Sequence, residues 1–261
     1  MDASMWVAKT GLTAQATKMT VIANNLANVN TVGFKKDRAI FEELLYQNLA
    51  QAGANTDATN EDPTGLMLGT GTRITSTEIL PTQGNMMSTE NSLDVAISGD
   101  GYFQITQNDG TFAYTRDGSF KLSSEGEIVT AEGLPLFPAI NVPANVSSIA
   151  VGRDGTITAE LPAGGGSSQL GQVQLARFQN RAGLMPLGRN LFGQTEASGI
   201  AETGVPSENG FGSLLQGMLE ASNVNVVEEM VSMIETQRAY EINSKAISAA
   251  DGMLRFLNNN L

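Results

Sequence analysis

The 261-residue chain contains neither cysteine nor histidine, and this limits the chemistry that its side chains can do. Disulfides, zinc sites built from Cys and His, Ser-His-Asp triads and Cys-His nucleophile pairs are all excluded. Carboxylates remain for general acid–base work, as in the paired carboxylates of glycosidases, and as oxygen ligands for a metal. The candidates for such a pair are Glu90, Asp94, Asp100 and Asp117.

The setting of these carboxylates favours backbone roles over catalysis. Asp100 lies between two glycines, and Asp117 precedes Gly118 where a turn is expected, a position that suits Asp for conformational reasons. No segment has the ligand spacing of a calcium loop, and the Gly-Thr-Gly of residues 69–71 lacks the Lys-Ser/Thr of a phosphate loop. We therefore expect no catalytic residue, no cofactor and no metal. A carboxylate-dependent, carbohydrate-acting enzyme is the alternative.

The charge distribution restricts the partners. Lys and Arg total 15 and Asp and Glu 27, so the net charge is −12, and the acidic excess is concentrated in residues 46–205. A binder of nucleic acid needs a basic face, so nucleic acid is not an expected partner. No run of about 18 apolar residues is present, and the first residues lack the apolar run of a secretory signal. We expect neither direct membrane insertion nor a cleavable signal peptide.

Along the first 30 residues, eight of the nine positions reached from Met1 by alternating steps of four and three are apolar, the exception being Gln15. This 3.5-residue repeat predicts a long amphipathic helix with a narrow apolar stripe. Asn30 and Gly33 suit its end, with Gly33 in the left-handed conformation. The stripe residues that we expect to form an assembly interface are Met5, Leu12, Met19, Ile22 and Leu26.

A second amphipathic helix is predicted from Asn225, a suitable N-cap, toward the C-terminus. Its apolar face is too wide to be covered by one neighbouring helix, and each exposed large apolar residue forfeits about 1.5–3 kcal/mol of burial. We therefore expect both helices to be loose in the isolated subunit and to be covered by other copies of the chain. Packing of the two helices against each other is the alternative. The residues expected at the C-terminal interface are Val227, Met230, Ile234, Ala239, Tyr240, Ile242, Ala246, Ile247, Met253 and Leu254.

The middle of the chain alternates apolar and polar residues with a period of two. Arg-Asp-Gly occurs at residues 116–118 and 153–155, each time between alternating segments, which is typical of a hairpin turn. The fold class predicted is α+β, with an antiparallel all-β outer domain inserted between the terminal helices of a coiled-coil-like inner domain. The expected divisions are residues 1–45 (helix and exit turn), 46–84 (extended polar connector and hairpin), 85–205 (β domain) and 206–261 (return strand and helix).

Three stretches resemble one known family. Residues 23–35 (ANNLANVNTVGFK) resemble the N-terminal motif of the bacterial flagellar rod and hook proteins, and residues 222–241 are similar to their C-terminal motif. Residues 92–103 also fit, so the resemblance covers essentially the whole chain. Within the family, the length and the stretch around residues 41–73 are similar to the subunits of the distal rod. The motif residues are Asn24, Asn25, Asn28, Gly33 and Phe34, and those of the rod-specific stretch are Tyr46, Gln47, Asp57 and Pro63.

This resemblance implies a structural subunit that polymerises helically around an export channel and transmits motor torque to the hook. The partners implied are other copies of the chain, proximal rod and hook subunits at the ends, the surrounding P and L rings, and the flagellar export apparatus. The implied location is the flagellar basal body, in the periplasmic space toward the outer membrane. A proximal rod or hook-type axial subunit is the alternative within the family.

Overall fold

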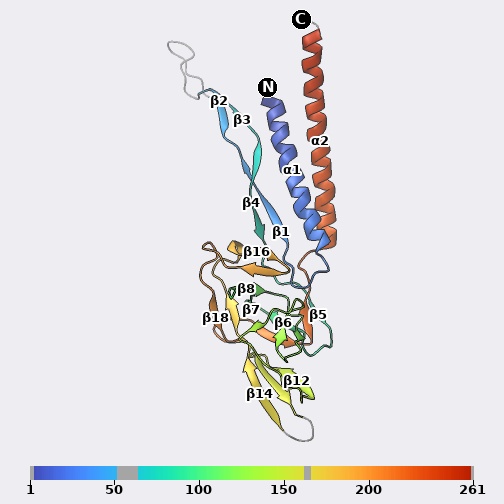
Figure 1. The fold of residues 1–261 in the computed structure, drawn as a ribbon. Coiled ribbons are helices and arrows are strands. Elements are labelled where there is room, and N and C mark those ends of the chain that lie inside the picture. The colour runs from blue at the N-terminus through green and yellow to red at the C-terminus, as the bar shows by residue number, and fades with distance from the viewer. Residues whose placement is uncertain (1–2, 52–63, 162–165, 260–261) are drawn as a thin grey trace. The chain divides into compact units, whose positions relative to one another are not determined.

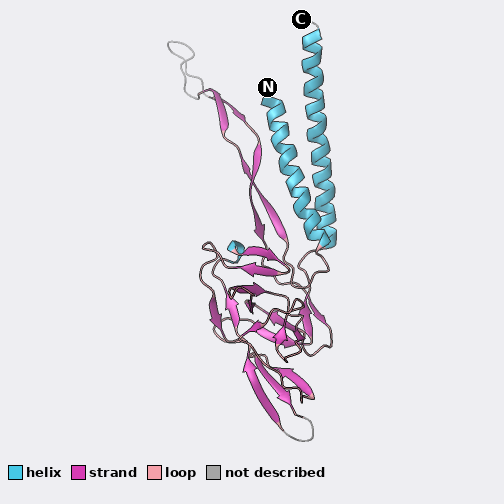
Figure 2. Cartoon of the chain, viewed as in Figure 1, coloured by secondary structure: helices cyan, strands magenta, loops and turns pink. Residues whose placement is uncertain are grey.

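The computed structural model of the chain describes residues 3–51, 64–161 and 166–259 (Figure 1). The chain divides into two compact units: unit 1 comprises residues 1–27, 37–78 and 225–261, and unit 2 comprises residues 28–36 and 79–224. Both helices longer than one turn belong to unit 1, and unit 2 is built of strands (Figure 2). The predicted α+β class, with a β-rich middle between terminal helices, is therefore confirmed. Within the described residues, neither helix has the length and apolar character needed to cross a bilayer.

Unit 1 contains helix α1 (Ala3–Ala27) and helix α2 (Val226–Asn259), which lie antiparallel to each other (Figure 1). Asn225 caps α2 as predicted, because its Oδ1 accepts a hydrogen bond from the amide of Val227 at 3.0 Å. The prediction that α1 continues to Asn30 or Gly33 is wrong, since the helix ends at Ala27. Asparagines at two of its last four positions, Asn24 and Asn25, weaken the helix, and the chain leaves it through turns.

The rest of unit 1 is a two-stranded ribbon made of two successive strand pairs. Its tip, residues 52–63, lies outside the described residues, as do Asp57 and Pro63 of the rod-specific stretch. Tyr46 and Gln47 of that stretch lie in β2, paired with Gly69 and Leu68. The pairs are β1 (Asp37–Glu43) with β4 (Thr72–Ile79), and β2 (Tyr46–Ala50) with β3 (Leu66–Gly69).

The largest sheet of unit 2 has seven strands, and its pairings are antiparallel. In spatial order six of them are β16 (Met185–Gly188), β17 (Leu191–Gly193), β8 (Phe112–Thr115), β7 (Tyr102–Thr106), β15 (Leu175–Arg177) and β18 (Glu202–Gly204), and β11 (Leu136–Phe137) also pairs with β7. A 3₁₀ turn, η2 (Arg181–Gly183), precedes β16.

Smaller antiparallel sheets complete unit 2. One has three strands, β12 (Ser148–Val151), β13 (Thr156–Glu160) and β14 (Ser167–Gln172). The three others are pairs: β5 (Met86–Ser88) with β20 (Met218–Glu220), β6 (Val95–Ser98) with β19 (Ser213–Gln216), and β9 (Lys121–Leu122) with β10 (Ile128–Val129).

The core of unit 2 follows from the alternation of side chains along β7. Phe103 and Ile105 point into a large apolar cluster, where the ring of Phe103 meets that of Phe120 edge-on at 5.0 Å. Tyr102 points to the other face and packs against Phe178 in a smaller cluster. Because both faces of β7 are covered, this strand is buried along most of its length.

The two Arg-Asp-Gly segments have different structures. The second is confirmed as a hairpin turn, because β12 and β13 pair directly on either side of Gly155, whose φ is +82°. The prediction for the first is wrong: β8 pairs with β7 and β17, whereas β9 pairs with β10. Gly118 is needed there for a close approach, since a Cβ would lie 1.7 Å from the carbonyl oxygen of Val95.

Candidate assembly surface

The two helices of unit 1 contact each other through small and polar residues. On α2, one side of the helix carries four residues spaced by seven: Glu229, Thr236, Asn243 and Ala250. Glu229, Thr236 and Ala250 are buried. The fourth, Asn243, faces Gly11 of α1, where a Cβ would lie 3.0 Å from Asn243 Nδ2. The buried residues of α1 are Ala8, Ala14, Ile22 and Asn25. We call this contact the helix seam.

The helix seam corrects one expectation from the sequence. We expected other copies of the chain to cover both helices, with packing inside one chain as the alternative. The structure shows the alternative along the seam, because α1 and α2 pack against each other within unit 1. Small residues allow this close approach, and the pairing leaves most of the large apolar residues of α2 outside the seam.

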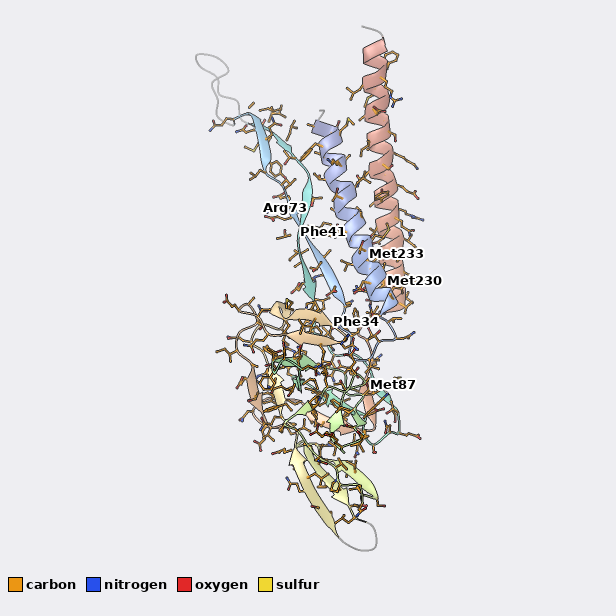
Figure 3. All side chains as sticks on the ribbon, viewed as in Figure 1. Phe34, Phe41, Arg73, Met87, Met230 and Met233 are labelled. Carbon is orange, nitrogen blue, oxygen red and sulfur yellow. The ribbon has the colours of Figure 1, made fainter. Side chains whose placement is uncertain are left out.

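The exposed apolar residues of α2 form the main candidate surface. Val227 and Val231 each lie two residues from Glu229, and Ile234 lies two residues from Thr236, which turns all three about 200° away from the helix seam. Val227 is 69% exposed and Met230 is 51% exposed. Figure 3 labels Met230 on α2. We define the α2 stripe as the exposed large apolar residues Val227, Met230, Val231, Ile234, Tyr240, Ile242, Met253 and Leu254.

Most of the remaining predicted interface residues are more covered. On α2, Ala239 and Ile247 are half-buried and Ala246 is exposed. On α1, Ile22 is only 4% exposed, so its side chain is already packed inside unit 1. The other α1 residues expected at the interface, Met5, Leu12, Met19 and Leu26, are half-buried. The α2 stripe thus offers far more exposed apolar surface than the predicted interface residues of α1 do.

Asn25 of the N-terminal motif ties three segments of unit 1 together. Its side chain pairs with the backbone of Asp37: the Oδ1 accepts from the amide at 2.9 Å, and the Nδ2 donates to the carbonyl at 2.9 Å. The same Nδ2 lies 3.3 Å from Glu229 Oε2 on α2. Burial raises the pKa of the Asp37 carboxyl above its usual range, because the charged form loses hydration. Of the three predicted motif asparagines, this one joins α1, β1 and α2.

Of the other motif residues, Asn24 belongs to α1, whereas Asn28, Gly33 and Phe34 follow the helix and belong to unit 2. The Oδ1 of Asn28 accepts a hydrogen bond from Thr31 Oγ1 at 3.2 Å, and Asn24 is an exposed residue of α1. Gly33 has a φ of +69°, as predicted, although it does not cap the helix. Its role is a close approach, since a Cβ there would lie 2.8 Å from the backbone of Arg116. Phe34 is half-buried beside it (Figure 3).

The ribbon of unit 1 also carries exposed apolar side chains. Leu45 is 89% exposed, and Phe41 and Tyr46 are exposed as well. Figure 3 labels Phe41 on the ribbon. An open groove of about 430 Å³ separates the ribbon from α1, lined by Trp6 and Thr13 of the helix and by Arg73 of β4. A two-stranded ribbon has little core of its own, so its apolar residues favour contact with another molecule.

Three of the four carboxylates that were weighed for catalysis are used in local structure. Asp100 forms two hydrogen bonds with Arg181, at 2.7 and 3.1 Å. Asp94 accepts from Asn91, and Asp117 accepts from Ser119. Among the described residues, no group of three or more acidic side chains is arranged to hold a metal ion.

Three residues that the sequence analysis did not single out are central to unit 2: Lys35, Asn223 and Glu220. Lys35 and Glu220 form a buried ion pair, and the side chain of Asn223 joins Lys36 to Leu80 and Thr82. Burial lowers the pKa of Lys35, although the charge of Glu220 opposes this. A signal was present, because Lys35 ends the N-terminal motif and Asn223 stands within the C-terminal one.

Comparison with known protein families gives three matches along the chain. Residues 5–35 match the family described as flagella basal body rod protein. Residues 96–159 match the D1 domain of the flagellar hook protein FlgE/F/G, and residues 215–260 match the C-terminal region of the flagellar basal body rod FlgEFG proteins. The three matches together lie in both helices and in the β-rich middle.

Individual relatives are similar over almost their entire length. The flagellar basal-body rod protein FlgG of Buchnera aphidicola from Acyrthosiphon pisum is 51% identical, over 98% of this chain and 99% of the relative. The protein of the same name from Borreliella burgdorferi is 47% identical, over 99% and 98%. That from Bacillus subtilis is 39% identical, over 98% of both chains.

Proposed function

The chain belongs to the family of flagellar basal-body rod proteins, and we propose that it polymerises through its terminal helices into the helical drive shaft of the flagellum. It is a structural subunit of the distal rod, not an enzyme. As a subunit it acts through the summed strength of its contacts, and none of its side chains needs to do chemistry. Head-to-tail contacts that do not close on themselves generate such a helical array.

The α2 stripe is the observation that carries this proposal. Val227, Val231 and Ile234 point away from the helix seam, and every member of the stripe is exposed, so pairing inside one chain leaves this apolar surface accessible. Burying each of them would stabilise an assembly by about 1.5–3 kcal/mol. Other copies of this chain are the partner that we propose for the α2 stripe, with the exposed apolar residues of the ribbon as a second contact.

The rod itself provides the other proposed partners. Proximal rod subunits at one end and hook subunits at the other are expected to contact the polymer, and the P and L rings to surround it. The chain is located in the flagellar basal body. We propose that it reaches its place in the periplasm through the flagellar export apparatus, without a cleavable signal.

The test is a pair of charge substitutions on the α2 stripe. Ile234→Asp and Ile242→Asp, made together, place charges on side chains that are 49% and 66% exposed, so the fold of the subunit should be unaffected. We expect loss of polymerisation and of motility. The matched control is Ile200→Asp in unit 2, where an 87% exposed isoleucine is replaced. Normal polymerisation and motility of the double variant would contradict the proposed interface.

A further inference from the structure

In unit 2, the chain segments that lead to unit 1 are joined to one another by hydrogen bonds and ion pairs. The chain passes between the two units after residues 27, 36, 78 and 224. Three short segments of unit 2 border these passages: Gly33–Lys36, residues 80–84 and residues 220–223. We call them, with Arg116, the junction. All of its residues belong to unit 2.

Backbone bonds and one asparagine connect the three segments of the junction. The amide of Leu80 donates to the carbonyl of Lys36 at 2.9 Å. The side chain of Asn223 accepts from the amide of Lys36 at 2.7 Å and donates to the carbonyl of Leu80 at 2.9 Å. The backbone amide of Asn223 donates to the carbonyl of Phe34 at 3.4 Å. Each segment is therefore bonded to both of the others.

A buried carboxylate occupies the centre of the junction. The side chain of Glu220 is fully buried, and it pairs with Lys35, whose Nζ also donates to the carbonyl of Thr82 at 2.8 Å. The second oxygen of Glu220 lies 3.3 Å from Arg116 Nη1. The amide of Gly84 donates to the first oxygen at 2.9 Å, so this one carboxylate connects its own segment to both of the other segments and to Arg116.

The choice of charged residues at the centre needs an explanation. A buried ion pair is seldom more stabilising than apolar residues of the same size, but breaking it leaves an unpaired charge in a dry site. Its bonds also have fixed directions, whereas an apolar contact can slide. These properties suit a place where segments must resist displacement along one another.

We propose that the junction is a mechanical clasp that carries load between the chain segments leading to the helices and the β-rich unit, with Glu220 as its central residue. This rests on the torque-transmitting role proposed above. Force applied to unit 1 reaches unit 2 along the backbone connections between the two units. These connections lead into the junction, so the hydrogen bonds and ion pairs of the junction are loaded together. Loads shared in this way are resisted better than loads on single contacts.

Single-molecule pulling on the full chain tests the clasp directly. The chain has no cysteine, so handles can be attached at chosen sites. One geometry, with Lys245→Cys and Ser124→Cys, loads unit 1 against unit 2. A second, with Ser124→Cys and Ser168→Cys, loads a part of unit 2 that does not include the junction. All three sites are exposed.

We expect Glu220→Gln to lower the rupture force by about half in the first geometry and to leave it unchanged in the second. The substitution removes the buried ion pair, and only the first geometry loads the segments that this pair holds together. Asn223→Ala, which leaves no buried charge unpaired, should act in the same direction and serves if Glu220→Gln does not fold. The matched control is Glu78→Gln, which removes a largely exposed ion pair with Arg38. It should not change the rupture force in either geometry.

Two results would overturn the clasp. One is an unchanged rupture force in the first geometry for both junction variants. The other is an equal fall in both geometries, which would indicate a general loss of stability. The measurement uses the isolated chain and does not depend on polymerisation. Failure to form a rod would therefore contradict the proposed function and leave this result standing.

Discussion

Glu229 accepts a hydrogen bond from Asn25 Nδ2 at 3.3 Å, which joins residues 204 positions apart. The bond connects the last turn of α1 to the first turn of α2, and the same asparagine holds both backbone groups of Asp37. Two distant sequence motifs thus meet through one side chain. Unit 1 is assembled from three separate stretches of the chain, and Asn25 contacts all of them.

Replacement of Asn25 should destabilise unit 1. Asn25→Ala leaves the amide and carbonyl of Asp37 without their partner, at a cost of about 2–4 kcal/mol for two or more buried groups. Urea unfolding followed by circular dichroism would measure the change. Thr20→Ala on the same helix is the control, because its hydroxyl bonds only to the carbonyl of Ala16. Equal effects of the two substitutions would contradict the role of Asn25.

The pH dependence of stability should reflect Asp37. Burial raises its pKa in the folded chain above the ordinary value of 3.8. At a pH between the ordinary pKa and the raised pKa, the folded state therefore binds more protons than the unfolded state. Its contribution to stability is present at low pH and is lost as the pH rises through the folded pKa. Asp37→Asn keeps the backbone bonds to Asn25 and should therefore be more stable than the wild type at neutral pH.

The measurement for Asp37 is the difference in unfolding free energy between the wild type and Asp37→Asn from pH 4 to pH 7. The difference should grow with pH in favour of the variant. A difference that stays constant over this range would show that the carboxyl of Asp37 keeps its ordinary pKa.

Gly71 fixes the position of the ribbon on α1. It has a φ of +114°, and a Cβ there would lie 2.0 Å from Thr10 Oγ1. Gly71→Ala should detach this end of the ribbon at a cost of about 1–3 kcal/mol. Hydrogen exchange of the β1 and β4 amides should accelerate, while that of unit 2 should not. Thr10→Ala in the same chain should restore part of the protection, because it removes the clashing oxygen.

The glycine of the first Arg-Asp-Gly segment should tolerate substitution worse than a glycine in an open turn. Gly118→Ala should cost about 3 kcal/mol, at the upper end for overpacking, since a Cβ would meet the carbonyl of Val95. Gly133→Ala should cost about 1–2 kcal/mol, because its φ is +85° but nothing lies within 4 Å. Thermal unfolding of both variants would compare them, and a larger effect at Gly133 would contradict the close packing.

Local patterns were enough to predict the terminal helices, the β-rich middle and the hairpin at Gly155. The same patterns failed at Arg116–Gly118, where a segment identical in type to the second one links two different sheets. The identity of the turn residues indicates which backbone conformations the chain can adopt locally. The partner that a strand selects depends on residues far away in the sequence.

The sequence by itself determined that two long amphipathic helices flank a β region, and that the chain carries the motifs of a flagellar rod subunit. Only the tertiary structure decided which side of each helix is used inside the subunit. Both an apolar stripe and a small, polar column run along α2, and periodicity alone does not distinguish the one that meets α1. The choice rests on contacts such as Gly11 with Asn243 and Asn25 with Glu229. Such contacts exist only when distant segments meet, and the apolar stripe stays exposed because of them.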